Sequence, residues 1–268
     1  MRWRGGRESD NVIDGRTVGV GVAGIGLVLA VGYFLLTGDP SALFNYAADQ
    51  ATTGASGQRS GQQVAGGEDD QVAFVKVVLG ETEDVWSQVF SDMGRTYEEP
   101  KLVLFRGRVG SACGLASEAT GPFYCPEDRQ VYLDLSFFTE LQNQLGARGD
   151  FARAYVIAHE VGHHVQNLLG LMERGSGPNR SVPIELQADC FAGLWAKRLQ
   201  ETTNVVEPGD VQEALDAAAA VGDDRLQMQS QGYVVPDSFT HGTSKQRMEW
   251  FSRGYAHGRL VDCDTSGS

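Results

Sequence analysis

Basic residues are scarce in this sequence of 268 residues. Lys and Arg number 22 against 35 Asp and Glu, which gives a net charge of −13. A nucleic-acid-binding protein needs a basic surface to neutralise phosphates, so the composition argues against that class of function. Cysteine is also scarce, with four residues, which excludes a miniprotein held together by disulfides. Hydrophobic residues make up 41% of the chain, which excludes a wholly disordered protein and allows one sizeable domain.

Charge is absent from residues 17–38, a run of 22 mostly apolar residues. A helix with a rise of about 1.5 Å per residue would let this run span a hydrocarbon core of about 30 Å, so we predict a transmembrane anchor here. Residues 1–16 carry four arginines, whereas residues 39–75 carry only Arg59. The positive-inside rule therefore predicts a single-pass protein of the cell membrane, with residues 1–16 cytoplasmic and the domain extracytoplasmic. A cleaved signal peptide and a buried core helix are the alternatives.

Large apolar side chains are almost missing from residues 49–70, which are rich in Gly, Ser, Gln and Thr. Such a segment cannot bury enough surface to fold, and we predict a flexible linker over residues 39–70. Hydrophobic residues return from residue 71, which predicts one globular domain over residues 71–268.

Hydrophobic periodicity within this domain indicates both helices and strands. We expect helices over 72–93, 136–145, 150–169 (with Asp150 as the N-cap), 184–200, 210–228 and 244–257, and strands over 101–108 and 130–135. This order of elements predicts an α+β fold that is mostly helical with a small sheet.

The four cysteines allow three pairings, and none of them belongs to a C-x-x-C pair that would indicate a structural zinc site. An even number of cysteines in a domain outside the cytoplasm favours disulfides. We predict the pair Cys113–Cys125, and Cys190–Cys263 then follows by elimination. Four buried free thiols are the alternative.

The most informative segment contains His159, Glu160 and His163 in an H-E-x-x-H pattern. Residues four apart lie on one face of a helix, so the two imidazoles can bind one zinc ion. Glu160 lies about 100° round the helix and can accept a proton from a zinc-bound water. The alternative is an amphipathic core helix with hydrogen-bonded histidines, which leaves the glutamate unexplained.

A catalytic zinc ion usually takes three protein ligands, so a third is expected downstream. The metzincin pattern is excluded, because Gln166 and Leu169 occupy its glycine and histidine positions. The next helix carries Glu185 and Asp189, four residues apart. We predict that Glu185 is the third ligand and that Asp189 accepts a hydrogen bond from His159. Two solvated acids on a helix surface are the alternative. One Zn²⁺ per chain is the only cofactor we predict.

An E-x-x-x-D pattern after H-E-x-x-H is similar to the arrangement in gluzincin peptidases. In addition, the chain resembles the bacterial neutral zinc metallopeptidase family of the YpfJ type in the segments YVIAHEVGHHVQ, ELQADCFAGLWA, SACG…GPFYCP…VYLDLSFF and MRWRGGRESDNV. The likeness covers nearly the whole chain. It implies a zincin-like fold, one membrane anchor and a metal-dependent peptidase, with His159, Glu160 and His163 at the motif positions and Glu185 as third ligand.

We therefore predict a membrane-anchored zinc peptidase that cleaves peptides or proteins and contacts the bilayer through residues 17–38. Glu160 would take a proton from the zinc-activated water and return it to the leaving amine. The alternatives are a zinc-stabilised envelope scaffold or partner-binding protein without catalysis, and hydrolysis of something other than protein.

Further residues have predicted roles around this site. His241 is a candidate for stabilising the oxyanion, and residues 101–108 are a candidate edge strand for pairing with an extended substrate. Residues 111–126 are expected to form a wall of the cleft. His164 and His257 are expected to be structural.

Overall fold

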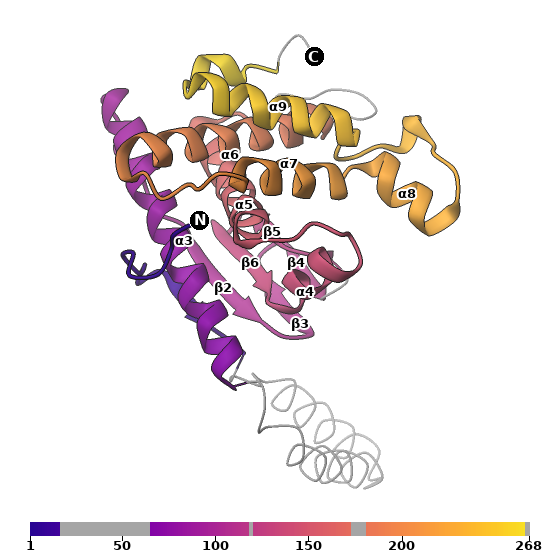
Figure 1. Cartoon of the computed structure of the whole chain (residues 1–268), viewed down its shortest axis with the longest axis horizontal. Helices are drawn as coiled ribbons and strands as arrows, with labels where there is room; N and C mark the ends of the chain where they lie inside the picture. Colours follow the sequence, from indigo (N-terminus) through magenta and orange to yellow (C-terminus); the bar gives the residue numbers. More distant parts are fainter. Residues whose placement is uncertain (17–64, 118–119, 173–180, 266–268) are drawn as a thin grey trace, which may run out of the picture. The chain divides into compact units, whose positions relative to one another are not determined.

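The computed structural model describes residues 1–16, 65–117, 120–172 and 181–265. The helices are α3 (Ala65–Asp92), α4 (Ser136–Asn143), α5 (Asp150–Leu169), α6 (Val182–Thr203), α7 (Asp210–Ala220), α8 (Asp223–Gln231) and α9 (Ser244–His257). The strands are β1 (Val12–Asp14), β2 (Lys101–Phe105), β3 (Arg108–Ser111), β4 (Gly114–Ser117), β5 (Phe123–Cys125) and β6 (Gln130–Asp134). The short 3₁₀ helices are η2 (Pro236–Ser238) and η3 (Leu260–Cys263). The predicted class, a helix-rich α+β fold with a small sheet, is confirmed (Figure 1).

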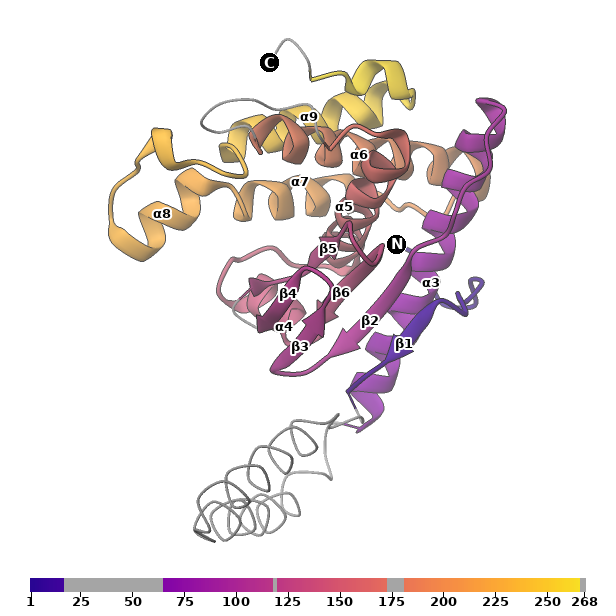
Figure 2. The same ribbon diagram turned by 180° about the vertical axis from the view of Figure 1, so that it is seen from behind.

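The main sheet has the strand order β1-β2-β6-β5. Strands β1, β2 and β6 are parallel, whereas β5 is antiparallel to β6 and forms one edge. Strands β3 and β4 form a separate antiparallel pair. Helix α3 runs beside the β1–β2 end of the sheet, and α5 lies between the sheet and a group formed by α6, α7 and α9 (Figures 1 and 2).

Helices α6 and α9 pack with their backbones almost in contact, because glycine occupies the crossing point on both. A Cβ atom at Gly254 would lie 1.9 Å from the carbonyl oxygen of Cys190, and one at Gly193 would lie 2.1 Å from that of Phe251. Real Cβ atoms do not approach so closely, so only glycine allows this crossing. The crossing brings α9 over the middle of α6.

Several predicted elements differ from the observed ones at points with a local physical cause. The helix predicted over 210–228 is divided into α7 and α8 at Gly222, where a Cβ would lie 2.3 Å from the amide nitrogen of Ser244. The strand predicted over 101–108 ends at Phe105. Asp150 is not the N-cap of α5: Gly149 takes that place with φ 104°, and Asp150 is the first helical residue.

Both predicted disulfides, Cys113–Cys125 and Cys190–Cys263, are confirmed. The first ties the turn between β3 and β4 to the edge strand β5, and the second ties α6 to η3. Free thiols, the alternative, do not occur among the described cysteines.

Residues 1–14 are part of the same compact unit as residues 73–268, whereas the sequence predicted a separate cytoplasmic segment over 1–16. Strand β1 pairs with β2, with Val12 opposite Leu102. The indole Nε1 of Trp3 donates to Asp150 Oδ2 at 2.9 Å. Residues 1–14 therefore lie beside β2 and α5 within one unit. The cytoplasmic position of residues 1–16 and the single-pass topology stay predictions.

The second unit, Gly15–Val72, is described only at its two ends. Helix α3 begins at Ala65, so residues 65–70 are helical although we assigned them to the linker. In the part of the chain that the structure describes, no helix has the length and apolar character needed to cross a bilayer. The predicted anchor, residues 17–38, lies outside the described residues and stays a prediction, as does the linker over residues 39–64.

Candidate metal centre

The H-E-x-x-H segment lies on α5, a helix that is buried on nearly every side. Its close contact with α6 depends on Gly162, the fourth residue of the motif. A Cβ at this position would lie 3.1 Å from the carbonyl oxygen of Ala188 and 3.3 Å from its Cα. Such distances are tighter than most side chains accept. The glycine therefore lets α6 approach the face of α5 that carries His159 and His163, and Glu185 stands one turn before Ala188.

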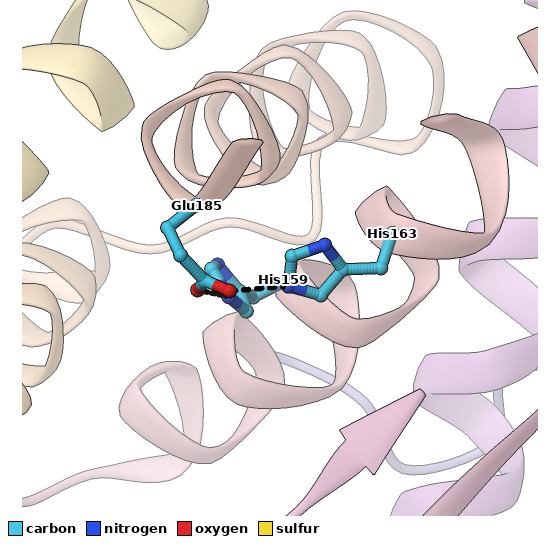
Figure 3. A group of neighbouring side chains, drawn as sticks. All are labelled: His159, His163 and Glu185. Carbon is cyan, nitrogen blue, oxygen red and sulfur yellow. Dashed lines mark hydrogen bonds and ion pairs between the residues drawn. The ribbon is translucent and has the colours of Figure 1, made fainter. Parts of the chain in front are cut away.

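The three predicted ligands meet between these helices (Figure 3). His159 Nε2 lies 3.1 Å from Glu185 Oε2, and His163 Nε2 lies 3.4 Å from Glu185 Oε1. One ligand atom from each side chain can be chosen so that all three lie within 4.8 Å of one another. A tetrahedral zinc ion with bonds of about 2.1 Å holds its donors about 3.4 Å apart. Two imidazoles and one carboxylate at these separations are a donor set that fits zinc.

The Nδ1 atom of each histidine, the ring nitrogen that does not approach Glu185, takes part in a hydrogen bond. His159 Nδ1–H donates to Asp189 Oδ1 at 2.9 Å, since a carboxylate can only accept, and Asp189 is fully buried. His163 Nδ1 lies 2.8 Å from Gln166 Oε1. In the neutral form of each ring, Nε2 is therefore the nitrogen that can bind a metal ion beside Glu185. The structure brings Asp189 to the place that the sequence predicted for it.

Sequence reasoning missed two residues that hold Asp189. Arg247 on α9 donates from Nε to Asp189 Oδ2 at 2.8 Å and from Nη2 to Oδ1 at 2.9 Å. The hydroxyl of Tyr155 donates to Oδ1 at 2.5 Å. Tyr155 precedes His159 by four residues, so helical spacing could have placed it on the same face. Arg247 lies 58 residues after Asp189, and nothing in the local sequence of α9 marks it.

The charges of the site shift the pKa values of its members in the metal-free protein. Burial by itself would lower the pKa of His159, but the carboxylates of Asp189 and Glu185 outweigh this effect and raise it to about 9. Burial opposes ionisation of Glu185, yet the two imidazoles outweigh it and lower its pKa. At pH 7 the His159 ring of the metal-free site is therefore doubly protonated and positively charged. A zinc ion has to displace the Nε2 proton in order to bind.

Glu160 lines the same pocket as the three candidate ligands, and 8% of its surface is exposed. Burial raises its pKa above the ordinary value, against the opposing effect of the two imidazoles. A carboxylate with a raised pKa is a stronger base toward a water proton near neutral pH. The pocket has a volume of about 580 Å³. Its walls are mostly apolar, with contributions from Phe123, Phe137, Ile184 and Leu226.

The predicted oxyanion residue His241 also lines this pocket. Its Nδ1 lies 3.1 Å from Asp223 Oδ1, and Asp223 Oδ2 accepts the backbone N–H groups of Thr240, His241 and Gly242. Burial alone would raise the pKa of Asp223, but the hydrogen bonds from His241 and its neighbours lower it. Asp223 thus holds residues 240–242 and the Nδ1 side of the His241 ring. Nε2 is then the ring nitrogen that remains available for contact with a substrate.

The prediction that residues 101–108 pair with a substrate is wrong. Strand β2 lies between β1 and β6, so both of its edges are already paired. The edge strand beside the pocket is β5, whose Phe123 and Tyr124 line the cavity together with residues 120–122. The expected wall formed by residues 111–126 is therefore present in its second half.

His164 holds this wall against α5. Its Nε2–H donates to the backbone oxygen of Glu98 at 2.7 Å, so its Nδ1 accepts from the hydroxyl of Tyr124 at 3.0 Å. Because Tyr124 belongs to β5, this buried histidine connects the motif helix to the edge strand. His257, in contrast, lies exposed in the last turn of α9 and does not line the pocket.

Comparison with known proteins agrees with this arrangement of residues. Residues 1–266 match the family described as "Putative neutral zinc metallopeptidase". The chain belongs to this family. One relative is "Uncharacterized protein YpfJ" of Escherichia coli strain K12, 47% identical over an alignment that covers 100% of this chain and 99% of the relative. Members from mycobacteria are also similar. "Uncharacterized protein Mb2605" of Mycobacterium bovis and "Uncharacterized protein Rv2575" of Mycobacterium tuberculosis are each 45% identical over 73% of this chain and 72% of their own length. No solved structure matches the chain. Family membership implies zinc and suggests a hydrolase.

Proposed function

We propose that this protein is a zinc-dependent peptidase, with zinc bound by His159, His163 and Glu185 and with Glu160 as the general base. The observation that carries the proposal is that three potential metal ligands converge in a pocket that also contains a buried carboxylic acid, Glu160. A zinc ion that serves only for stability is usually enclosed by four protein ligands. The three donors here leave a position for water and substrate. The zincin-like fold remains part of this proposal.

The chain's own residues would divide the work of hydrolysis. Zinc in this site would polarise a peptide carbonyl and lower the pKa of a water molecule. Glu160 would accept the proton of the attacking water and deliver it to the leaving amine. His241, doubly protonated and held by Asp223 through its Nδ1–H, would donate from Nε2–H to the developing oxyanion. An extended peptide would pair with β5, and its apolar side chains would contact the apolar walls of the pocket.

Zinc binding is the first test of the proposal. Titration of the metal-free protein at pH 7 should saturate at one zinc ion per chain. Because His159 has a pKa of about 9 without metal, binding should also release about one proton per zinc or more. Above pH 9 this release should decrease, since His159 is then already neutral. Calorimetry in buffers of different ionisation enthalpy measures both quantities. Sub-stoichiometric binding would contradict the proposed ligand set.

Cleavage is the second half of the same test. The zinc-loaded protein should cleave a casein mixture, a chelator should abolish the cleavage, and added zinc should restore it. Fragments that form equally with and without the chelator would come from another activity, and the peptidase proposal would then be wrong.

We further propose that the domain works outside the cytoplasm, attached to the bilayer through residues 17–38. Disulfides persist mainly in oxidising compartments, and the described part of the chain contains two. Since residues 1–14 pack with the domain, single cysteines at Asp10 and Val261, both exposed, should both react with a membrane-impermeant maleimide in intact cells. Labelling of only one would support the single-pass topology and contradict the packing. Lysed cells, in which both sites should react, serve as the control.

A further inference from the structure

Two buried amide side chains connect the second histidine to the C-terminal disulfide. Gln166 is completely buried and 7% of Gln187 is exposed. Gln166 Oε1 lies 2.8 Å from His163 Nδ1, and Gln166 Nε2 donates to Gln187 Oε1 at 3.1 Å. Gln187 Nε2 in turn donates to the backbone oxygen of Cys263 at 2.8 Å. We call this series of three hydrogen bonds the relay. It extends from α5 across α6 to η3, where Cys263 is bonded to Cys190.

The direction of every hydrogen bond in this relay is fixed by its far end. The carbonyl oxygen of Cys263 can only accept, so Gln187 must turn its NH₂ group toward it and its oxygen toward Gln166. Gln166 must then donate to that oxygen and present its own oxygen to His163. The ring consequently carries a proton on Nδ1, so in the neutral ring Nε2 is the nitrogen left to bind a metal ion beside Glu185. A backbone carbonyl 100 residues away in the sequence thereby selects the metal-binding form of His163.

Gln166 has a second contact that concerns the third candidate ligand. Its Nε2 also donates to the backbone oxygen of Ile184 at 2.7 Å. Ile184 immediately precedes Glu185 in the first turns of α6. One amide group thus fixes the ring of His163 and the backbone next to Glu185 relative to each other. The outer partner of His159 is a carboxylate paired with Arg247, so the two histidines are oriented by chemically different groups.

We propose that Gln166 and Gln187 are positioning residues through which the Cys190–Cys263 disulfide fixes the geometry of the metal site. This inference rests on the proposed zinc site. The disulfide holds η3 against α6 and thereby keeps the Cys263 carbonyl at the end of the relay. Loss of an outer hydrogen-bond partner of a metal-binding histidine typically weakens metal binding about 10–100-fold. Zinc affinity should therefore depend on a disulfide that has no atom in the metal site.

The test measures the zinc dissociation constant by competition with a chromophoric chelator, without any assay of cleavage. Gln166→Met should raise it about 10–100-fold and Gln187→Met by a smaller factor, because only Gln166 contacts the ring. Gln200→Met is the matched control, since Gln200 also lies on α6 but bonds to Asn204; its affinity should equal that of the wild type. Imidazole nitrogen shifts in NMR spectra report the tautomer of His163, which should become mixed in the metal-free Gln166→Met protein.

A double-mutant cycle tests the link to the disulfide. Replacing both cysteines, Cys190→Ala and Cys263→Ala, should weaken zinc binding, and adding Gln187→Met should then cost little more, because both changes interrupt the same relay. Additive effects, or wild-type affinity in the folded Gln166→Met protein, would overturn the proposal. Should the cysteine variant not fold, the two glutamine variants still decide, since they keep the disulfide. If the wild-type protein itself binds no zinc, the proposed function fails, which is a separate result.

Discussion

Glu160→Gln should reduce the rate of peptide cleavage about 10²–10⁴-fold, the usual contribution of a general base, while the protein keeps one zinc ion per chain. Glutamine matches glutamate in shape but cannot accept the proton of the attacking water. Zinc should stay because the three candidate ligands, His159, His163 and Glu185, are untouched. The measurements are kcat on a peptide substrate and the zinc content of the same preparation.

The same variant separates an enzyme from a zinc-stabilised scaffold. Burial raises the pKa of Glu160, so at neutral pH its ionised form makes folding less favourable. Removing this charge should therefore leave the free energy of unfolding equal to or above that of the wild type. Glu201→Gln, on the exposed end of α6, is the matched control and should leave both rate and stability unchanged. A Glu160→Gln protein that cleaves normally, or that is markedly less stable, would favour the scaffold.

The local pattern of the sequence was sufficient to predict which side chains meet in the candidate metal centre. Residues four apart lie on the same face of a helix, so His159 is beside His163, and Glu185 is beside Asp189, independently of the tertiary structure. The structure then brings these two pairs together, because Gly162 allows α5 and α6 into close contact. The bounds of α5 and α9 also agree with the predicted ones. Both helices end at a glycine in the left-handed conformation, Gly170 after α5 and Gly258 after α9, which is a clear local end signal.

Features that depend on long-range packing could not be predicted in this way. The sheet order puts β2 between two partners, and no residue within 101–108 reveals this. The pairing of β1 with β2 joins segments about 90 residues apart in the sequence. The sequence of residues 1–16, considered alone, therefore predicts only a polar N-terminal segment and no strand. Gly222 interrupts a continuous helical pattern because of Ser244, a neighbour only in space. The ion pair of Arg247 with Asp189 likewise joins residues that are 58 positions apart in the sequence, so it could not be predicted from either segment alone.

Arg247→Met should lower the free energy of unfolding by about 3 kcal/mol, the lower end of the range for a buried ion pair that loses one partner. Arg247 and Asp189 are almost completely buried and bonded through two nitrogens and both carboxylate oxygens. Without the guanidinium, Asp189 remains a buried carboxylate. His159, which is protonated at pH 7 in the metal-free protein, offsets part of the loss. Chemical denaturation of the metal-free protein at pH 7 measures the effect.

Two further variants show whether the pair or the methionine is responsible. Arg253→Met makes the same substitution on the same helix at an exposed position, and its effect should stay within about 0.5 kcal/mol. Adding Asp189→Asn to Arg247→Met removes the unpaired charge, so the double variant should recover part of the lost stability. Its zinc affinity should nevertheless fall below that of the wild type, because asparagine is a weaker acceptor for His159 Nδ1–H than a carboxylate. Recovered stability together with weakened zinc binding would show that Asp189, which Arg247 of α9 holds in place, supports the metal site through His159. If the double variant bound zinc as tightly as the wild type, Asp189 and Arg247 would be a structural pair with no influence on the ligand.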